Sequence, residues 1–109
     1  MIKITSKQKH WKSVNKFMKR KHSNTDKGHP AWVYRKRGRV YKYLSFTHKP
    51  EKNAPDQYER LKYNIDPCDD RDCFVSKKYF ITQKTAFEEP IKKYRIHEKD
   101  KDTIKKYSK

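Results

Sequence analysis

Three adjacent residues, Thr47, His48 and Lys49, carry side chains that suit acid–base chemistry on a phosphodiester. RNA is cleaved without metal when a base deprotonates the 2′-hydroxyl, a cation stabilises the phosphorane, and an acid protonates the leaving oxygen. His48 suits proton transfer near neutral pH, Lys49 or Arg39 suits the developing negative charge, and Thr47 could orient the phosphate. The alternative is that Thr47 ends a strand and that His48 and Lys49 are ordinary exposed loop residues.

A second group, just upstream, alternates basic and aromatic side chains. Its members are Arg35, Arg37, Arg39, Tyr41, Lys42 and Tyr43. Guanidinium groups bind phosphates bidentately, and exposed tyrosine rings stack on unpaired bases. Because stacking needs unstacked bases, the pattern favours single-stranded RNA over duplex DNA as the partner. The alternative is that the tyrosines belong to the core and the basic residues are merely solvated.

The overall charge supports binding to a polyanion. The 109 residues include 30 Lys and Arg against 13 Asp and Glu, a formal charge of +17. Such a charge repels itself and destabilises a compact chain unless a polyanion offsets it. An anionic membrane is the rival partner, but it requires an apolar or amphipathic anchor. No apolar run approaches a membrane-spanning length, and MIKITSKQKHW lacks the apolar segment of a signal peptide. We therefore expect a cytoplasmic protein without a membrane partner.

Cysteines and acidic residues offer weak metal signals. Cys68 and Cys73 lie five residues apart, which is not a zinc-ligand spacing, so we expect free thiols. The acidic residues that cluster nearby are Asp66, Asp69, Asp70 and Asp72. Their spacing does not match a calcium loop. We interpret them as turn caps and partners of the many lysines, and we predict no metal and no cofactor.

The size of the chain allows one domain, residues 1–109, with basic ends that fray. The run HPAWVYRKRGRVYKYLSFTHK predicts a hairpin, with strands over 31–34 and 40–47 and a turn at Arg35–Gly38. Alternation on the return strand puts Leu44 and Phe46 on one face and Tyr41 and Tyr43 on the other. Since both faces carry apolar residues, we expect a strongly curved sheet or a small barrel.

Before the hairpin, Ile2 and Ile4 suit a short edge strand, and Thr5 or Ser6 suits a helix cap. The apolar residues of the expected amphipathic helix are Trp11, Val14, Phe17 and Met18. Its opposite face carries Lys9, Lys12, Lys16, Lys19 and Arg20, of which we expect Lys12 and Lys16 to contact RNA. The segment 19–30 is rich in turn formers and predicts a loop.

After the hairpin, residues 50–67 predict a long loop with a helical turn around 57–62. Strands are expected over 73–75, 78–82 and 93–96. The tail predicts a short helix with Asp100, Ile104 and Tyr107 on one face. The fold class is therefore α+β, mainly β: a small bent antiparallel sheet or barrel with an N-terminal amphipathic helix and a short C-terminal helix.

The run HPAWVYRKRGRVYKYLSFTHKP resembles the strand, turn and active-site segment of the MazF/PemK-like toxin barrels. Within them it is similar to the ToxN/AbiQ branch, whose YxxPLTSxK-type strand ends in catalytic hydroxyl and basic residues. The resemblance implies a catalytic or phosphate-binding role for Thr47 and Lys49. His48 stands where that branch has serine, and Phe46 stands where it has proline. The segments NIDPCDDRDCFV and YRIHEKDKDTIKKY also resemble small proteins of bacterial mobile elements.

Three functions follow as hypotheses. The first, implied by the resemblance, is a metal-independent, sequence-selective endoribonuclease restrained by a protein or RNA antitoxin. The second is a non-catalytic nucleic-acid-binding protein that uses the same basic face. The third is a structural protein scaffolded by RNA, such as a ribosome-associated protein. That third function fits the charge but favours long basic tails over a tyrosine-rich strand.

Overall fold

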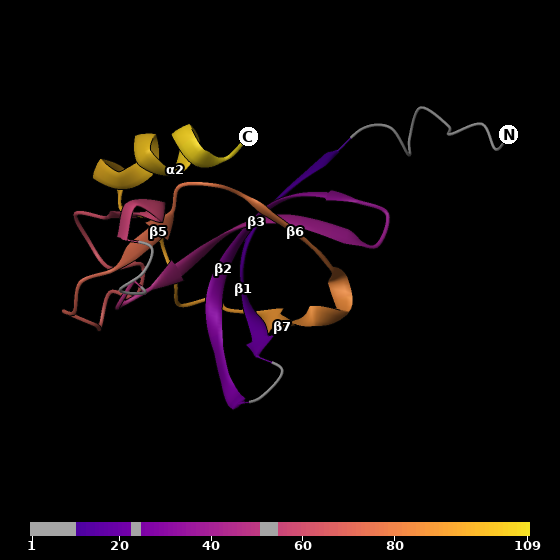
Figure 1. Cartoon of the computed structure of the whole chain (residues 1–109), viewed down its shortest axis with the longest axis horizontal. Coiled ribbons are helices and arrows are strands. Elements are labelled where there is room, and N and C mark those ends of the chain that lie inside the picture. Colours follow the sequence, from indigo (N-terminus) through magenta and orange to yellow (C-terminus); the bar gives the residue numbers. More distant parts are fainter. Residues whose placement is uncertain (1–10, 23–24, 51–54) are drawn as a thin grey trace, which may run out of the picture.

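The computed structural model describes residues 11–22, 25–50 and 55–109. Within them, seven strands form one antiparallel sheet with the order β4-β5-β3-β2-β1-β7, and β6 pairs with β3 beside this path. Figure 1 shows the long strands β1 to β3 at the centre and the short C-terminal helix α2 at one side. The strands are β1 (Lys12–His22), β2 (Thr25–Arg37), β3 (Val40–Thr47), β4 (Tyr58–Arg60), β5 (Phe74–Ser76), β6 (Phe80–Gln83) and β7 (Phe87–Pro90).

The β2–β3 hairpin predicted from the alternation is confirmed, but the predicted turn at Arg35–Gly38 is wrong, because β2 continues to Arg37 and the turn is Gly38–Arg39. Ala31 pairs with Ser45 at one end and Arg37 with Val40 at the other. The tight turn contains Gly38 at a φ of 58°, a left-handed conformation that glycine adopts without steric cost. β3 is the central strand: β2 flanks one edge, while β6 and β5 share the other edge, one after the other.

The predicted N-terminal helix is wrong, because Lys12–His22 forms β1. Phe17 packs in one core cluster and the adjacent Met18 in the other, so β1 is buried on both faces. A bulge also interrupts its pairing with β2 between Ser13 and Lys16. Strands of this kind lack clean alternation, and the apolar spacing imitates a helix. The predicted edge strand and the helix caps lie in residues 1–10, outside the described residues.

The predicted loop over 19–30 is also wrong, since β1 continues to His22 and β2 begins at Thr25. Within the expected loop 50–67, the structure has a 3₁₀ turn, η1 (Pro55–Gln57), followed by β4. Strands were correctly expected near 73–75 and 78–82, where β5 and β6 lie. Residues 93–96 are not a strand; β7 takes the place next to β1 instead.

The sheet is bent but open, so the barrel is not formed. Its end strands among the described residues are β4 and β7. One cluster of buried side chains contains Tyr34, Leu44 and Phe46 and lies under residues 90–109, which we call the C-terminal segment. The other cluster contains Tyr41, Tyr43 and Phe87. The face assignment predicted for β3 is therefore confirmed.

The predicted C-terminal helix is confirmed as the 3₁₀ turn η3 (Glu98–Asp100) followed by α2 (Lys101–Tyr107). Ile104 of α2 is buried in the core, and the Asp100 carboxylate accepts hydrogen bonds from the backbone N–H groups of Lys62 and Tyr63 at 2.8 and 2.9 Å. In the part of the chain that the structure describes, no helix has the length and apolar character needed to cross a membrane.

Candidate functional site

Thr47, His48 and Lys49 lie together where β3 ends. The Thr47 hydroxyl donates to the Lys49 carbonyl at 3.2 Å and accepts from the Lys49 backbone N–H at 3.3 Å. This hydroxyl therefore closes the turn that follows the strand, a common task for threonine. The side chains of His48 and Lys49 are exposed.

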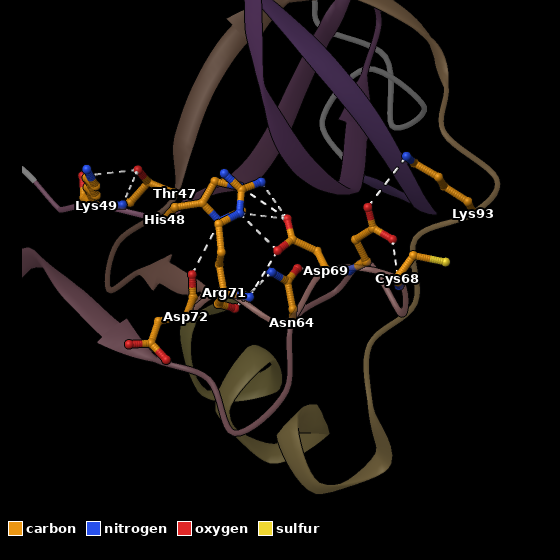
Figure 2. A network of polar contacts seen from close by, with 10 residues as sticks. Thr47, His48, Lys49, Asn64, Cys68, Asp69, Arg71, Asp72 and Lys93 are labelled. Atoms are coloured by element: carbon orange, nitrogen blue, oxygen red, sulfur yellow. Dashed lines mark hydrogen bonds and ion pairs between the residues drawn. The ribbon is translucent and has the colours of Figure 1, made fainter.

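His48 is held by the acidic loop that precedes β5. Its Nδ1 lies 3.3 Å from the Asp72 carbonyl and its Nε2 lies 3.7 Å from Asp69 Oδ2. Figure 2 shows His48 and Arg71 turned towards the same Asp69 carboxylate. Arg71 binds that carboxylate through Nε and Nη2, the latter at 2.6 Å. These hydrogen bonds, with smaller contributions from the charges of Arg71 and His48, hold the pKa of Asp69 well below its usual range.

The three residues line a cavity of about 1110 Å³, together with Asn64, Arg71, Lys93 and the acidic cluster. A histidine beside a carboxylate is suited to proton transfer because the carboxylate orients the ring. However, four aspartates also line this cavity. Their negative charge opposes the approach of a phosphate, so the cavity is not a basic groove.

The acidic cluster does what the sequence led us to expect, capping turns and pairing with cations. Asp66 accepts from the Cys68 backbone N–H at 3.0 Å and lies 3.5 Å from Lys93 Nζ. Asp72 binds Arg60 at 2.8 Å. In the described ranges, no group of three or more His, Cys, Asp or Glu side chains is arranged to hold a metal ion. Both cysteines are free thiols.

The predicted RNA-binding group is only partly available at the surface. Tyr41 and Tyr43 are 8% and 3% exposed and pack against Phe87, with ring centroids at 5.4 and 5.1 Å. Neither ring offers a face to a base. The two tyrosines are therefore core residues and not the base-stacking residues that we predicted. This was the alternative left open by the sequence.

Lys42 is also buried, at 8% exposure. Its ammonium lies 4.8 Å from the Trp11 ring centre and 4.3 Å from that of Tyr79, and it donates to the Lys109 carbonyl at 3.1 Å. Burial lowers the pKa of Lys42, and the charges of Arg35 and Arg37 lower it further. We therefore correct Lys42 from a phosphate contact to a structural cation.

The remaining basic residues gather where the β2–β3 hairpin turns. Lys12 pairs with Lys36, Ser13 with Arg35, and the Lys84 backbone N–H donates to the Arg39 carbonyl at 2.8 Å. We name this group the basic hairpin end: Lys12, Arg35, Lys36, Arg37, Arg39 and Lys84. Two rings that the sequence analysis did not select for RNA binding contact cations of the hairpin. The Trp11 ring lies 4.7 Å from the Arg37 guanidinium carbon, and the Tyr79 ring, 39% exposed, lies 4.3 Å from the Lys42 ammonium.

The structure does not bring the two predicted groups together. The basic hairpin end lies at the start of β3 and Thr47 at its end, eight residues along an extended strand of about 3.3 Å per residue. Lys16, opposite Val33, lies further along β1 than Lys12. The site therefore divides into a basic hairpin end and a separate cavity around His48.

Comparison with known proteins adds no assignment: no protein-family model, curated protein or solved structure matches this chain. The resemblance to the MazF/PemK-like toxins, and to their ToxN/AbiQ branch, stays a prediction from residues 29–50.

Proposed function

We propose that this protein binds single-stranded RNA through the basic hairpin end. The observation that carries the proposal is the gathering of six cations at one end of the hairpin. Among the described residues, no carboxylate forms an ion pair with any of these six. Four cations elsewhere do pair with acids: Lys19 with Glu88, Arg60 with Asp72, Arg71 with Asp69 and Lys93 with Asp66.

The distribution of charge along the chain supports the same conclusion. Residues 1–50 contain 15 Lys and Arg and a single acidic residue, Asp26, whereas residues 51–109 contain 15 Lys and Arg and 12 acidic residues. Unpaired like charges on neighbouring strands repel each other, and a polyanion relieves that repulsion. Tyr79 is 39% exposed, and its ring lies 4.3 Å from the Lys42 ammonium. An exposed ring of this kind suits stacking on an unpaired base, which favours a single strand.

The test compares two charge-reversal variants with the same net charge. We expect Arg37→Glu/Arg39→Glu to weaken binding to a fluorescent oligouridylate of about 12 nucleotides by at least about tenfold, since each phosphate contact contributes about fourfold at ~0.15 M salt. Lys62→Glu/Lys99→Glu changes exposed residues beside α2 and should weaken binding to the oligouridylate by less than about threefold. Fluorescence anisotropy measures both affinities, and circular dichroism checks that both variants fold. Equal losses would mean that only net charge matters.

RNA cleavage at His48 is a second candidate, favoured by the exposed side chains of His48 and Lys49, which line the same cavity. In this mechanism His48 removes the 2′-hydroxyl proton, and the oxygen attacks phosphorus. The 5′-oxygen then leaves with a proton from the protonated ring. Lys49 stabilises the added negative charge. Such an enzyme would be restrained by an antitoxin, as the resemblance implies.

Cleavage has a distinctive product, because attack by the 2′-hydroxyl leaves a 2′,3′-cyclic phosphate. We expect activity that persists in EDTA and falls by about 10²-fold or more in His48→Ala, the usual range for loss of a general base. Lys49→Ala should also lose activity, whereas Lys62→Ala should not. If the parent protein binds RNA and yields no cyclic phosphate, the function is binding without catalysis.

A further inference from the structure

A second hollow of the molecule lies between the sheet and the C-terminal segment, away from His48. Its volume is about 760 Å³, within the range of roughly 300–1,000 Å³ typical of small-molecule sites. It is lined by β1, by Trp32 of β2 and by the segment 90–101. A smaller hollow of about 320 Å³ shares Asn15, Trp32, Ile96 and Lys101 with it and continues to Arg35. We call the two together the trough.

The floor of the trough is aromatic. The Trp32 and Phe17 rings lie 4.8 Å apart, and the Tyr94 ring meets Phe17 edge-on at 5.8 Å. Phe17 is buried, whereas Trp32 and Tyr94 are only partly buried and contribute surface to the trough. A planar ring that is open on one side is the surface on which a nucleobase stacks.

The charged side chains along the trough, among the residues that the structure describes, are all cationic. They are Lys16, Arg35, Lys92, Arg95, Lys101 and Lys105. Within those described residues no aspartate or glutamate lines either hollow, in contrast to the four aspartates of the cavity around His48. An apolar floor with a cationic rim fits a ligand that joins a flat apolar group to a negative charge.

A bulge in β1 shapes one wall of the trough. Val14 and Asn15 together oppose Tyr34, and Asn15 has a φ of 57°. Asparagine tolerates this left-handed conformation better than most residues, and bulges re-aim side chains out of the regular ladder. Asn15 thereby lines both hollows, where its amide can donate to and accept from a base edge.

We infer that the trough binds an unpaired base of a single-stranded RNA, stacked on Trp32, with the flanking phosphates on the cationic rim. This inference rests on the RNA binding proposed above and names where the base goes. The connection is physical, because the trough reaches Arg35, which belongs to the basic hairpin end. One strand of RNA can therefore contact both surfaces.

The experiment isolates Trp32 as the fluorophore. Trp11 and Trp32 are the two tryptophans of the chain, so Trp11→Phe leaves emission from Trp32 alone. Two probes are titrated: an oligouridylate of about 12 nucleotides, and an abasic ribose-phosphate strand of the same length and charge. We expect quenching of Trp32 by the oligouridylate only, and tighter binding of it by about tenfold, the order typical of one stacked base.

A matched pair of variants completes the test. Trp32→Leu should remove the preference for the base-bearing strand, whereas Tyr63→Leu, at a 45% exposed ring that lines neither hollow, should keep it. Trp32 also packs on the core, so Trp32→Leu can destabilise the fold. The quenching measurement does not depend on that variant, because it uses Trp11→Phe.

The outcomes separate the two claims. If neither strand binds, the RNA binding itself fails. If both strands bind equally and Trp32 is not quenched, RNA binding stands and the trough inference is overturned. Tighter binding and stronger quenching by an acidic peptide of glutamate and leucine would overturn it too, because the trough would then be a protein-docking groove.

Discussion

At the scale of single residues, burial decides what each cysteine can do. Cys73 is 3% exposed and packs in the core under the C-terminal segment, where loss of hydration raises the pKa of its thiol to about 11. Cys68 is exposed on the acidic loop. Since the thiolate is the reactive form of cysteine, the two residues should differ in alkylation.

We expect iodoacetamide at about pH 8 to modify Cys68 alone in the folded protein. Cys73 should react only after unfolding, or as the pH rises towards its pKa of about 11. Intact-mass measurements over time should show one added group in the native protein and two in denaturant. Cys68→Ser is the control and should show none while folded. Rapid double modification of the native protein would contradict the buried position of Cys73.

Residue identity alone could not separate binding residues from core residues. Basic and aromatic residues such as Tyr41, Lys42 and Tyr43 are typical of an RNA-binding strand. In this fold both faces of β3 are covered, so these three residues are buried. Arg37 and Arg39 remain exposed because Arg37 ends β2 and Arg39 lies in the turn. Aromatic and basic residue types thus select the hairpin that carries the proposed interface, while tertiary packing decides which of them reach the solvent.

At the scale of elements, α2 depends on its contacts, because seven residues are too few for a stable isolated helix. Asp100, 2% exposed, ties the start of α2 to the chain after β4 through two backbone N–H groups. At the other end of the helix, the Tyr107 hydroxyl donates to Glu59. These links hold the C-terminal segment over the core, and other residues of that segment line one side of the trough.

Replacing Asp100 by Asn should therefore destabilise the fold. The amide keeps the size of the side chain but places an N–H group where a backbone N–H now donates, so we expect a loss of about 1.5–3 kcal/mol. Asp102→Asn, at an exposed position in the same helix, should cost no more than about 1 kcal/mol, the typical limit for a helix-dipole interaction at the surface. Urea unfolding measures both. Similar costs for the two variants would show that Asp100 does not anchor the helix.

The hairpin was the most predictable element, because alternation and the demand for glycine at the turn agree with each other. β1 was not predictable in the same way. Its register with β2 shifts at Asn15, and neighbouring residues on both faces are buried. Long-range pairing overrode the local apolar spacing, which fits a helix equally well.

At the scale of the whole molecule, the two halves of the chain differ in charge, and in the folded protein the basic hairpin end and the acidic loop lie apart. The basic hairpin end has no acidic partner in the described ranges, and the acidic loop lies at the other end of β3, around His48. The separation could not be predicted from the sequence, because it follows from where β5 pairs with β3. The trough could not be predicted from the sequence either, because β1, β2 and the segment 90–101 each supply part of its lining.

The most direct test of RNA binding by the basic hairpin end is its salt dependence. For the parent protein and a single-stranded oligouridylate, we predict a log–log slope of affinity against salt of about −3 or steeper, at about 0.7 per phosphate contact. Arg37→Glu/Arg39→Glu should make the slope shallower by about 1.4, while Lys62→Glu/Lys99→Glu should leave it unchanged. A parent slope weaker than about −1, or the same slope in all three proteins, would contradict the proposed interface.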